Sequence, residues 1–307
     1  MALLEQISNL LGLKQSKAKG LLGVHFHKDG VSLAYTSQPA QKGQIDLCEF
    51  IACEESERFK QVKKFVAKHS LGKNLDVNLI LPPPDYRTLT IDAPDIEPSE
   101  YHHAAAWLVK DLLDYPVTEA DIDLFPMPAG EQKKLYLICA RQSVIRGYIS
   151  EFQKLHMNLM GTETIELALR NLLLLKQVDN CLLMFKTDYF TGVMIYKHQT
   201  IYLVRSIRAD LDEMSHRKLI TELKRSLDYF KNQTKEEPPQ KIILTPNLLV
   251  YDHLQEHLTN QFNMSIEYID PRELVTMPEL DDDANARCVI AIGATQSLQA
   301  MQMLQAE

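Results

Sequence analysis

Apolar residues follow two different spacings in the first part of the chain. After Gly20, three short runs alternate apolar and polar positions between tight polar breaks, which predicts three strands in a meander. Segment 55–70 instead repeats its apolar residues every three or four positions, as an amphipathic helix does. A buried-type strand at 76–81 follows and ends at three prolines. The three opening strands are expected at 21–27, 31–37 and 44–50.

The same order returns in the second half of the chain. Three more strand-like runs precede a long amphipathic helix and another buried-type strand. A further helix and strand extend this second module, and the last segment predicts a closing strand that runs into a terminal helix. In chain order these segments are 180–186, 191–197, 200–207, 212–233, 241–246, 248–262, 264–270 and 287–305.

A smaller α/β unit is expected between the two modules. Its apolar pattern indicates strand, helix, strand, strand and helix, and a further helix at 162–175 then leads into the second module. The five elements of the unit are expected at 86–92, 100–113, 119–125, 134–140 and 144–157.

Two copies of one strand and helix order predict an α/β chain with two lobes. A meander followed by a right-handed crossover gives a mixed sheet, so the duplication implies two such sheets with a cleft between them. This order is typical of the actin-like (ribonuclease H-like) bilobed fold, here with an inserted α/β subdomain. The predicted domains are an N-terminal helix 1–19, a first lobe 20–84, an insert 85–157, a connecting helix 158–178 and a second lobe 179–307.

The charge balance argues against one class of partner. The chain has 33 Lys and Arg residues against 41 Asp and Glu residues, a net charge of −8. A dedicated nucleic-acid binder needs a basic face to neutralise phosphates, so no nucleic-acid partner is expected.

The cysteines and the N-terminal segment bear on location. Five scattered cysteines without a C-x-x-C pair suit a reducing compartment, and no run is long and apolar enough for a membrane span or a signal peptide. We therefore expect a cytoplasmic protein. Residues 1–19 predict an amphipathic helix with a basic end, which either contacts a membrane surface or partner, or packs on its own domain.

Three stretches of the sequence resemble the PilM family of actin-like cytoplasmic proteins of type IV pilus assembly. They are 21–35, 86–127 and 286–301, and the middle one contains Trp107 and a Tyr115-Pro116 exit. The resemblance covers roughly residues 20 to 305 and is closest to the MSHA-pilus branch, MshI.

The resemblance implies a nucleotide cleft and a partner. The partner is the N-terminal cytoplasmic tail of a bitopic, PilN-like inner-membrane protein, which would bind in a groove near the first lobe and the insert. The chain would then lie peripherally at the inner membrane, with possible lipid contact through 1–19. The candidate partner-binding residues on the insert are Tyr86, Tyr101, Trp107 and Leu108, although packing in the core is favoured for Trp107.

The first phosphate loop of that family is not reproduced here. Actin-like ATPases place an Asp, a Gly and small hydroxylic residues after the first strand, because backbone amides cradle the phosphates and the carboxylate holds hydrated Mg²⁺. In this sequence His25 stands at the Asp position and His27 at the Gly position, and Lys28 and Asp29 replace the small residues.

The second loop and the adenosine site depart as well. Phe185 stands near the acidic position and Thr187 near the glycine, between Lys186 and Asp188, and Pro246-Asn247 replaces a Gly-Gly pair. We therefore expect a vestigial cleft, no cofactor and no catalysis. The alternative is an actin-like ATP-binding protein or ATPase with divergent loops, in which Lys28 or Lys186 meets a phosphate as a point charge.

Gly293 does match a family position. It is the small residue that allows two connecting helices to cross closely, and packing against Ala168 or its neighbours is favoured over a ligand role.

A remote enzyme alternative comes from the segment 253–257. Its H-x-x-E-H pattern fits inverted zinc peptidases, in which two histidines one helical turn apart share a metal and the Glu acts as base. Glu273 or Glu279 would have to supply the third ligand, so a solvated helix flank is the favoured interpretation and no metal is expected. His102 and His103 are adjacent on a helix, point about 100° apart and are expected at the surface.

Overall fold

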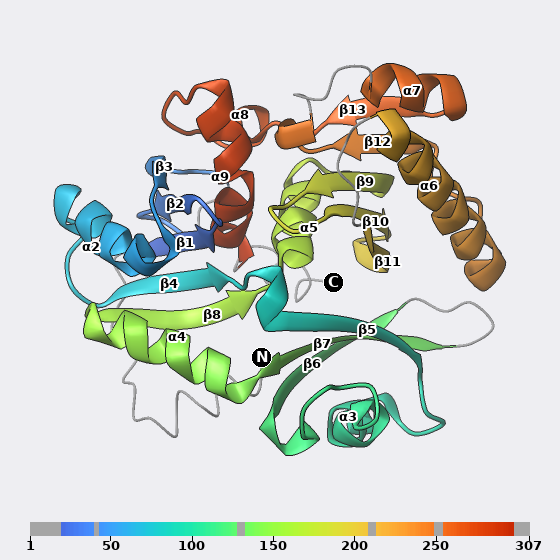
Figure 1. Cartoon of the computed structure of the whole chain (residues 1–307), viewed down its shortest axis with the longest axis horizontal. Coiled ribbons are helices and arrows are strands. Elements are labelled where there is room, and N and C mark those ends of the chain that lie inside the picture. The colour runs from blue at the N-terminus through green and yellow to red at the C-terminus, as the bar shows by residue number, and fades with distance from the viewer. Residues whose placement is uncertain (1–19, 40–42, 128–132, 208–212, 249–253, 298–307) are drawn as a thin grey trace.

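The computed structural model describes residues 20–39, 43–127, 133–207, 213–248 and 254–297. Two mixed sheets lie side by side, and a smaller sheet lies below them (Figure 1). The predicted helix 1–19 and the end of the terminal helix fall outside the described residues. Within the described ranges, no helix is both long and apolar enough to cross a membrane.

The first sheet has five strands in the order β3-β2-β1-β4-β8. Antiparallel pairing joins β1, β2 and β3, whereas β4 and β8 run parallel to β1. Helices α2 and α4 pack on this sheet and bury Val62, Phe65, Ile149 and Phe152 in one apolar cluster with the strands of the sheet. The elements are β1 (Leu21–Phe26), β2 (Gly30–Thr36), β3 (Leu47–Ala52), α2 (Arg58–Lys68), β4 (Leu75–Ile80), α4 (Gln142–Lys154) and β8 (Met157–Glu163).

The second sheet repeats this arrangement in the order β11-β10-β9-β12-β13. Its first three strands are antiparallel neighbours and its last two are parallel to β9. The duplicated module predicted from the apolar pattern is therefore confirmed. The elements are β9 (Asn180–Lys186), β10 (Thr191–Lys197), β11 (Thr200–Ile207), α6 (Glu213–Thr234), β12 (Lys241–Leu244), α7 (Leu254–Gln261) and β13 (Ser265–Tyr268).

The insert is an antiparallel sheet in the order β5-β7-β6, covered by one helix. Tyr101, Ala105 and Val109 recur every four residues on α3 and pack on Leu124 and Leu137 of the sheet. The elements are β5 (Tyr86–Asp92), α3 (Tyr101–Val109), β6 (Ala120–Met127) and β7 (Lys134–Arg141). Short 3₁₀ turns lie at Glu55–Glu57, Pro83–Asp85, Pro98–Glu100, Val117–Glu119 and Pro246–Leu248.

Three sequence-based element assignments need correction. The helix at 144–157, predicted as the last element of the small inserted unit, is α4, and its apolar face with Ile145, Ile149 and Phe152 packs on the first sheet instead. The segment 158–178, predicted as one connecting helix, begins with most of strand β8 and continues as helix α5 (Ile165–Leu175). The strand was missed because β8 is only half-buried and carries no alternating apolar pattern. The closing strand predicted from residue 287 is instead part of helix α9 (Asp282–Thr295), because a short, fully apolar run has the same composition in a buried helix and in a strand. The domain boundaries themselves stay a prediction.

Helices α5 and α9 cross between the two large sheets (Figure 1). A Cβ atom added at Gly293 would lie 2.3 Å from the carbonyl oxygen of Ala168, so only glycine allows this separation. Asn171 donates a hydrogen bond to the carbonyl of Gly293 at 3.1 Å. The predicted packing of Gly293 against Ala168 is confirmed. A short helix, α8 (Pro271–Leu274), precedes α9.

Candidate functional site

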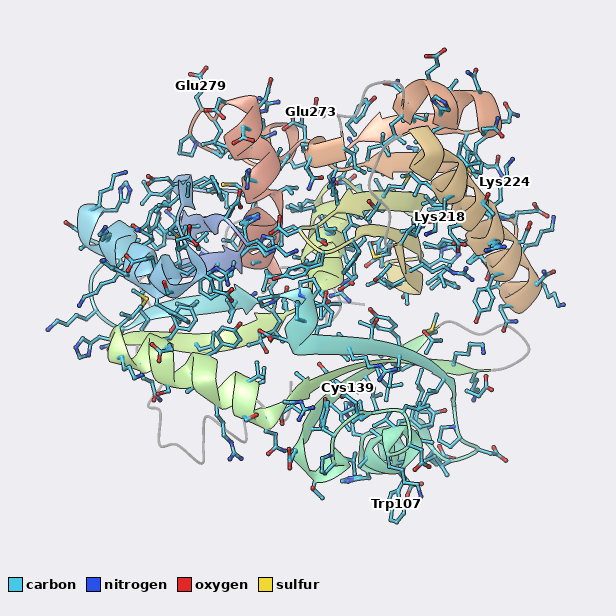
Figure 2. All side chains as sticks on the ribbon, viewed as in Figure 1. Trp107, Cys139, Lys218, Lys224, Glu273 and Glu279 are labelled. Carbon is cyan, nitrogen blue, oxygen red and sulfur yellow. The ribbon has the colours of Figure 1, made fainter. Side chains whose placement is uncertain are left out.

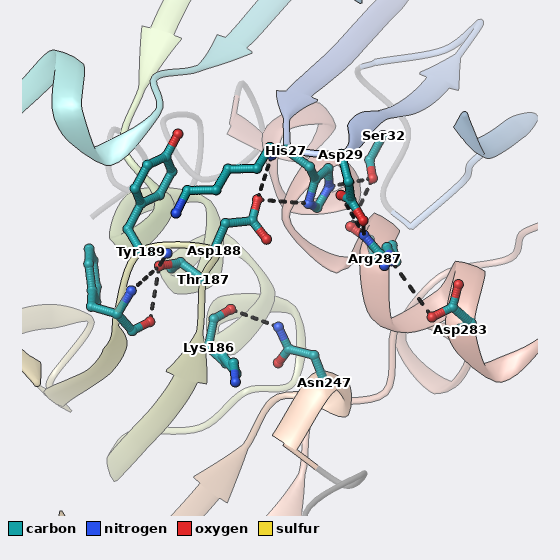
Figure 3. Close-up of polar contacts among 12 residues, drawn as sticks. His27, Asp29, Ser32, Lys186, Thr187, Asp188, Tyr189, Asn247, Asp283 and Arg287 are labelled. Atoms are coloured by element: carbon teal, nitrogen blue, oxygen red, sulfur yellow. Dashed lines mark hydrogen bonds and ion pairs between the residues drawn. The ribbon is translucent and has the colours of Figure 1, made fainter. Parts of the chain in front are cut away.

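The turns of two hairpins, one from each large sheet, meet at the candidate site (Figure 3). In the β1–β2 turn, the amide of His27 donates to the carbonyl of Gly30 at 2.9 Å. In the β9–β10 turn, the amide of Thr187 donates to the carbonyl of Phe190 at the same distance. Because the two sheets repeat one topology, these turns occupy equivalent places in the two lobes.

Asp188 joins the two turns. Its Oδ2 atom accepts a hydrogen bond from the backbone amide of Lys28 at 2.9 Å and lies 3.6 Å from Nδ1 of His27. Burial alone would raise the pKa of this carboxyl, but His27 and the Lys28 amide outweigh burial and hold the pKa below its usual range. Asp188 is therefore a carboxylate at neutral pH. The amide of Lys28 is engaged as long as the turns remain in contact.

Ser32 fixes the orientation of the His27 ring. Nε2 of His27 lies 2.8 Å from Oγ of Ser32, and that hydroxyl donates to the carbonyl of Arg287 at 2.9 Å. His27 and Ser32 are both buried. The first lobe and α9 therefore hold the imidazole, while the second lobe supplies the carboxylate that faces it.

His25 lies two residues earlier, near the end of β1. Its ring centroid is 4.3 Å from that of His27, and no described residue forms a hydrogen bond with its buried Nδ1. Burial, with a smaller contribution from His27, lowers the pKa of His25 well below its usual value. Two imidazoles thus lie where the family resemblance implies an Asp and a Gly.

Arg287 of α9 binds the tip of the first turn. Its guanidinium contacts both carboxylate oxygens of Asp29 at 2.8 Å and lies 3.6 Å from Asp283, one helical turn away. The guanidinium also covers the ring of Phe50, 4.4 Å from its centroid. Arg287 and Ser32 were not predicted as site residues, because the contacts that place them here join positions 258 and 255 residues apart.

Side chains also fill the second turn. The hydroxyl of Thr187 accepts hydrogen bonds from the amides of Tyr189 and Phe190 at 3.1 and 3.0 Å. Asn247 donates to the carbonyl of Lys186 at 2.7 Å, so the residue at the expected adenosine site supports the turn instead. Nζ of Lys28 lies over the ring of Tyr189, 4.4 Å from its centroid. The structure thus brings together the predicted cleft residues of both turns, whereas Gly293 lies at the helix crossing.

One group of side chains within the described part of the chain could hold a metal ion. The ligand atoms of His27, Asp29 and Asp188 all lie within 4.8 Å of one another. The first two residues come from the first lobe and the third from the second lobe, so a bound ion would bridge the lobes.

The four predicted partner-binding residues lie in different surroundings. Tyr101 is 3 % exposed and belongs to the core of the insert, and Leu108 packs partly on that core. Trp107 is 74 % exposed, so packing in the core, the favoured interpretation of its pattern, is wrong. Figure 2 shows Trp107 projecting outward from the insert. Of the four, Trp107 alone presents a large exposed apolar surface, and Nζ of Lys110 lies over its ring, 5.2 Å from the centroid.

Tyr86 connects the insert to α5. Its hydroxyl donates to Oε2 of Glu166 at 3.0 Å. Burial raises the pKa of Glu166, and the hydrogen bonds from its own amide, Thr164 and Tyr86 offset only part of this rise. The tyrosine therefore has a structural partner at the base of the insert.

The zinc pair of the remote enzyme alternative cannot be assembled from the described residues. His253 lies outside them, and His257 is on α7. Glu273 on α8 and Glu279 beyond it are exposed, as Figure 2 shows. The zinc hydrolase alternative stays a prediction. His102 and His103 are exposed on α3, as expected.

No family model matches this chain, and no curated protein does. Solved structures do match over most of its length. A PilM-PilN type IV pilus biogenesis complex contains a chain with a TM-score of 0.71 at 15 % identity, covering 94 % of this chain and 99 % of that one. The cytoplasmic domain of EpsL, an inner-membrane component of the type II secretion system of Vibrio cholerae, matches with a TM-score of 0.53 at 9 % identity. The match covers 91 % of this chain and 95 % of that one.

A third match is a protein of unknown function with an actin-like ATPase fold from Bacteroides thetaiotaomicron. It has a TM-score of 0.51 at 11 % identity and covers 88 % of this chain and 96 % of that one. The chain therefore has the actin-like fold predicted from its duplicated element order, similar to that in the PilM-PilN complex. At these identities the likeness establishes the fold alone.

Proposed function

We propose that this chain is a non-catalytic, actin-like scaffold of type IV pilus assembly, of the MSHA type represented by MshI. It binds the N-terminal cytoplasmic tail of a PilN-like inner-membrane protein and lies peripherally on the cytoplasmic face of that membrane. The likeness to the PilM-PilN complex over 94 % of the chain supports this assignment. The observation that carries it is the indole of Trp107, which is far more exposed than the other large apolar side chains of the insert, most of which are buried or half-buried.

The surroundings of Trp107 indicate the chemistry of the tail. Ile96 and Leu112 flank α3 and are 38 % and 41 % exposed. The stretch 95–119 carries exposed acidic side chains and a single lysine, Lys110. A tail that combines apolar residues with Lys or Arg would bury the indole while its charges meet these carboxylates. The exposed acidic residues are Asp95, Glu97, Glu100, Asp111, Asp114 and Glu119.

Tyr86 and Tyr101 would act on this surface indirectly. Tyr101 anchors α3 on the insert sheet, and Tyr86 fixes the start of β5 to α5 through Glu166. A surface held in place by these contacts is already ordered before binding, which lowers the entropic cost of binding the tail.

The contact between the two turns supports the non-catalytic part of the proposal. The Lys28 amide, a donor that a phosphate would need, already donates to Asp188, and the Asp188 carboxylate would repel a triphosphate. The residues at the contact between the two turns thus fit Mg-ATP poorly. The rival ATPase requires that the two lobes separate at this contact.

A calorimetric titration with a synthetic peptide of the N-terminal cytoplasmic tail of a PilN-like inner-membrane protein tests the proposal. We expect micromolar binding to the wild type and to Met160→Ala, a control that removes an exposed apolar side chain from β8. Trp107→Ala should bind at least about tenfold more weakly, as expected for a buried aromatic anchor. Absence of binding to any form, or equal binding to Trp107→Ala, would refute the proposal. Loss of binding only on deletion of residues 1–19 would instead place the contact on the N-terminal segment.

A further inference from the structure

The arrangement of His27 and Asp188 is unusual for a direct hydrogen bond. Nδ1 of His27 and Oδ2 of Asp188 are 3.6 Å apart, whereas an N–H···O hydrogen bond spans about 2.7–3.2 Å. A tetrahedral ion with bonds of about 2.0–2.1 Å to each atom would separate a nitrogen ligand from an oxygen ligand by about 3.4 Å. The observed spacing is therefore close to that of two ligands of one ion.

The hydrogen bonds of Ser32 determine which nitrogen of His27 carries the proton. The Ser32 hydroxyl has one hydrogen and donates it to the carbonyl of Arg287. It must then accept a hydrogen bond from Nε2–H of His27. In the neutral ring Nδ1 consequently has a free lone pair, and that lone pair faces a carboxylate oxygen. A cation between these two electron-rich atoms, either a proton on Nδ1 or a metal ion, removes the repulsion between them.

Hydrogen bonds also orient the carboxylate. The Oδ2 atom that faces His27 accepts a hydrogen bond from the Lys28 amide at 2.9 Å. Metal-binding histidines in proteins are held through their other ring nitrogen, as His27 is by Ser32, and ligating carboxylates are themselves hydrogen-bonded, as Asp188 is by the Lys28 amide. Ser32 and the Lys28 amide hold His27 and Asp188 before any ion arrives.

Asp29 could supply a third ligand. Its carboxylate lies within 4.8 Å of the other two ligand atoms. Arg287 binds both of its oxygens, but a carboxylate has about four lone-pair sites, so two remain for other contacts. The buried, unpaired Nδ1 of His25 adds a neutral polar atom beside this group.

We propose that His27, Asp29 and Asp188 form a binding site for a divalent transition-metal ion of the zinc type, which bridges the two lobes. Imidazole and carboxylate ligands suit Zn²⁺, whereas Mg²⁺ prefers oxygen ligands and retains its water. The site differs from the hydrated Mg²⁺ of a nucleotide cleft because all three ligands are side chains of this chain. It is independent of the tail-binding proposal, since the insert contributes no ligand.

Zinc and cobalt titrations test the site. The probes are Zn²⁺ followed by calorimetry and Co²⁺ followed by visible absorption, with the full chain free of affinity tags and treated with a chelator beforehand. We expect one equivalent to bind the wild type, with the absorption of tetrahedral Co²⁺. His27→Gln and Asp188→Asn should each weaken binding by more than about 100-fold, and Ser32→Ala by about 10- to 100-fold.

His198→Gln is the matched control. His198 and Asp179 also form a histidine–carboxylate pair, at 3.4 Å, but both are well exposed and they are not part of the three-residue group. This variant should bind zinc as the wild type does. Thermal unfolding in chelator verifies that each variant folds, and Asp29→Asn, at an exposed position, replaces any variant that does not fold. Absence of zinc binding to the wild type, or full binding to a folded ligand variant, would overturn the site.

Discussion

The carboxylate of Asp188 accepts a hydrogen bond from the backbone amide of Lys28 across 160 residues of sequence. The amide belongs to the β1–β2 turn and the carboxylate to the β9–β10 turn, so a side chain of the second lobe bonds to the backbone of the first lobe. In a phosphate-binding cleft of this fold such amides would point at a bound anion. In this chain the Asp188 carboxylate bonds to the Lys28 amide instead.

Mg-ATP is therefore expected to leave the thermal stability unchanged. A ligand present at 1,000 times its dissociation constant would stabilise the folded state by about 4.1 kcal/mol. With roughly 2–4 °C per kcal/mol for a protein of this size, a micromolar binder at millimolar concentration would raise the Tm by about 8 °C or more. We predict a shift below 1 °C relative to Mg²⁺ alone in differential scanning fluorimetry. A rise of several degrees would show that the turns open and would favour the ATP-binding alternative.

The helix crossing at Gly293 makes a second prediction. Gly293→Ala places a methyl group against the Ala168 backbone, which cannot move as a flexible side chain would. We expect a loss of about 1–3 kcal/mol in the free energy of unfolding, measured in urea. Gly147→Ala is the control, because it lies on exposed α4 surface where an added Cβ meets nothing within 4 Å. That change should stabilise by about 0.5–1 kcal/mol. Equal effects at the two positions would contradict the close crossing.

Glu166 predicts a pH dependence of stability. Burial raises its pKa in the folded state above the usual value of 4.5, so its contribution to stability is present below pH 4.5 and is lost as pH rises through the folded pKa. Glu166→Gln removes this loss and retains an acceptor for the Tyr86 hydroxyl. The variant should therefore gain free energy of unfolding over the wild type as pH rises from 4.5 to 8. A difference that stays constant with pH, measured by urea unfolding, would contradict this account.

The element order could be predicted because each module has a clear apolar period. The three-stranded meanders and amphipathic helices of both lobes, and the order of the insert elements, were read correctly from local patterns. Strand β8 could not be predicted from its sequence, because parallel pairing with β4 stabilises it and it carries no apolar pattern of its own. Helix α9 was misread at its apolar end, since a run buried on every side shows neither period.

The candidate site was predictable only in its local part. Aligning the first turn with a phosphate loop singled out His27, and the second turn singled out Asp188. Their contact with each other, and the roles of Ser32 and Arg287, depend on the docking of α9 and the two lobes. The exposure of Trp107 could not be predicted, because apolar residues lie on more than one side of helix α3. The sheet buries only the face that carries Tyr101, Ala105 and Val109.

The exposure of Trp107 makes a prediction that needs no partner. Because its side chain is 74 % exposed, Trp107→Ala should change the free energy of unfolding by no more than about 0.5 kcal/mol. Truncation of the buried Tyr101 to alanine should cost about 3–5 kcal/mol, as for a large aromatic core residue. Chemical unfolding followed by circular dichroism measures both. A large loss for Trp107→Ala would mean that the indole packs in the core after all.

The protein contains one tryptophan, so its fluorescence reports directly on the surface proposed to bind the membrane protein's tail. The most direct test is a titration of the wild type with the synthetic tail peptide of the PilN-like protein, following Trp107 emission. We predict the red emission of a solvated indole in the free protein and a saturable blue shift as the tail covers it. Saturable binding that leaves the emission unchanged, or no binding, would contradict the account.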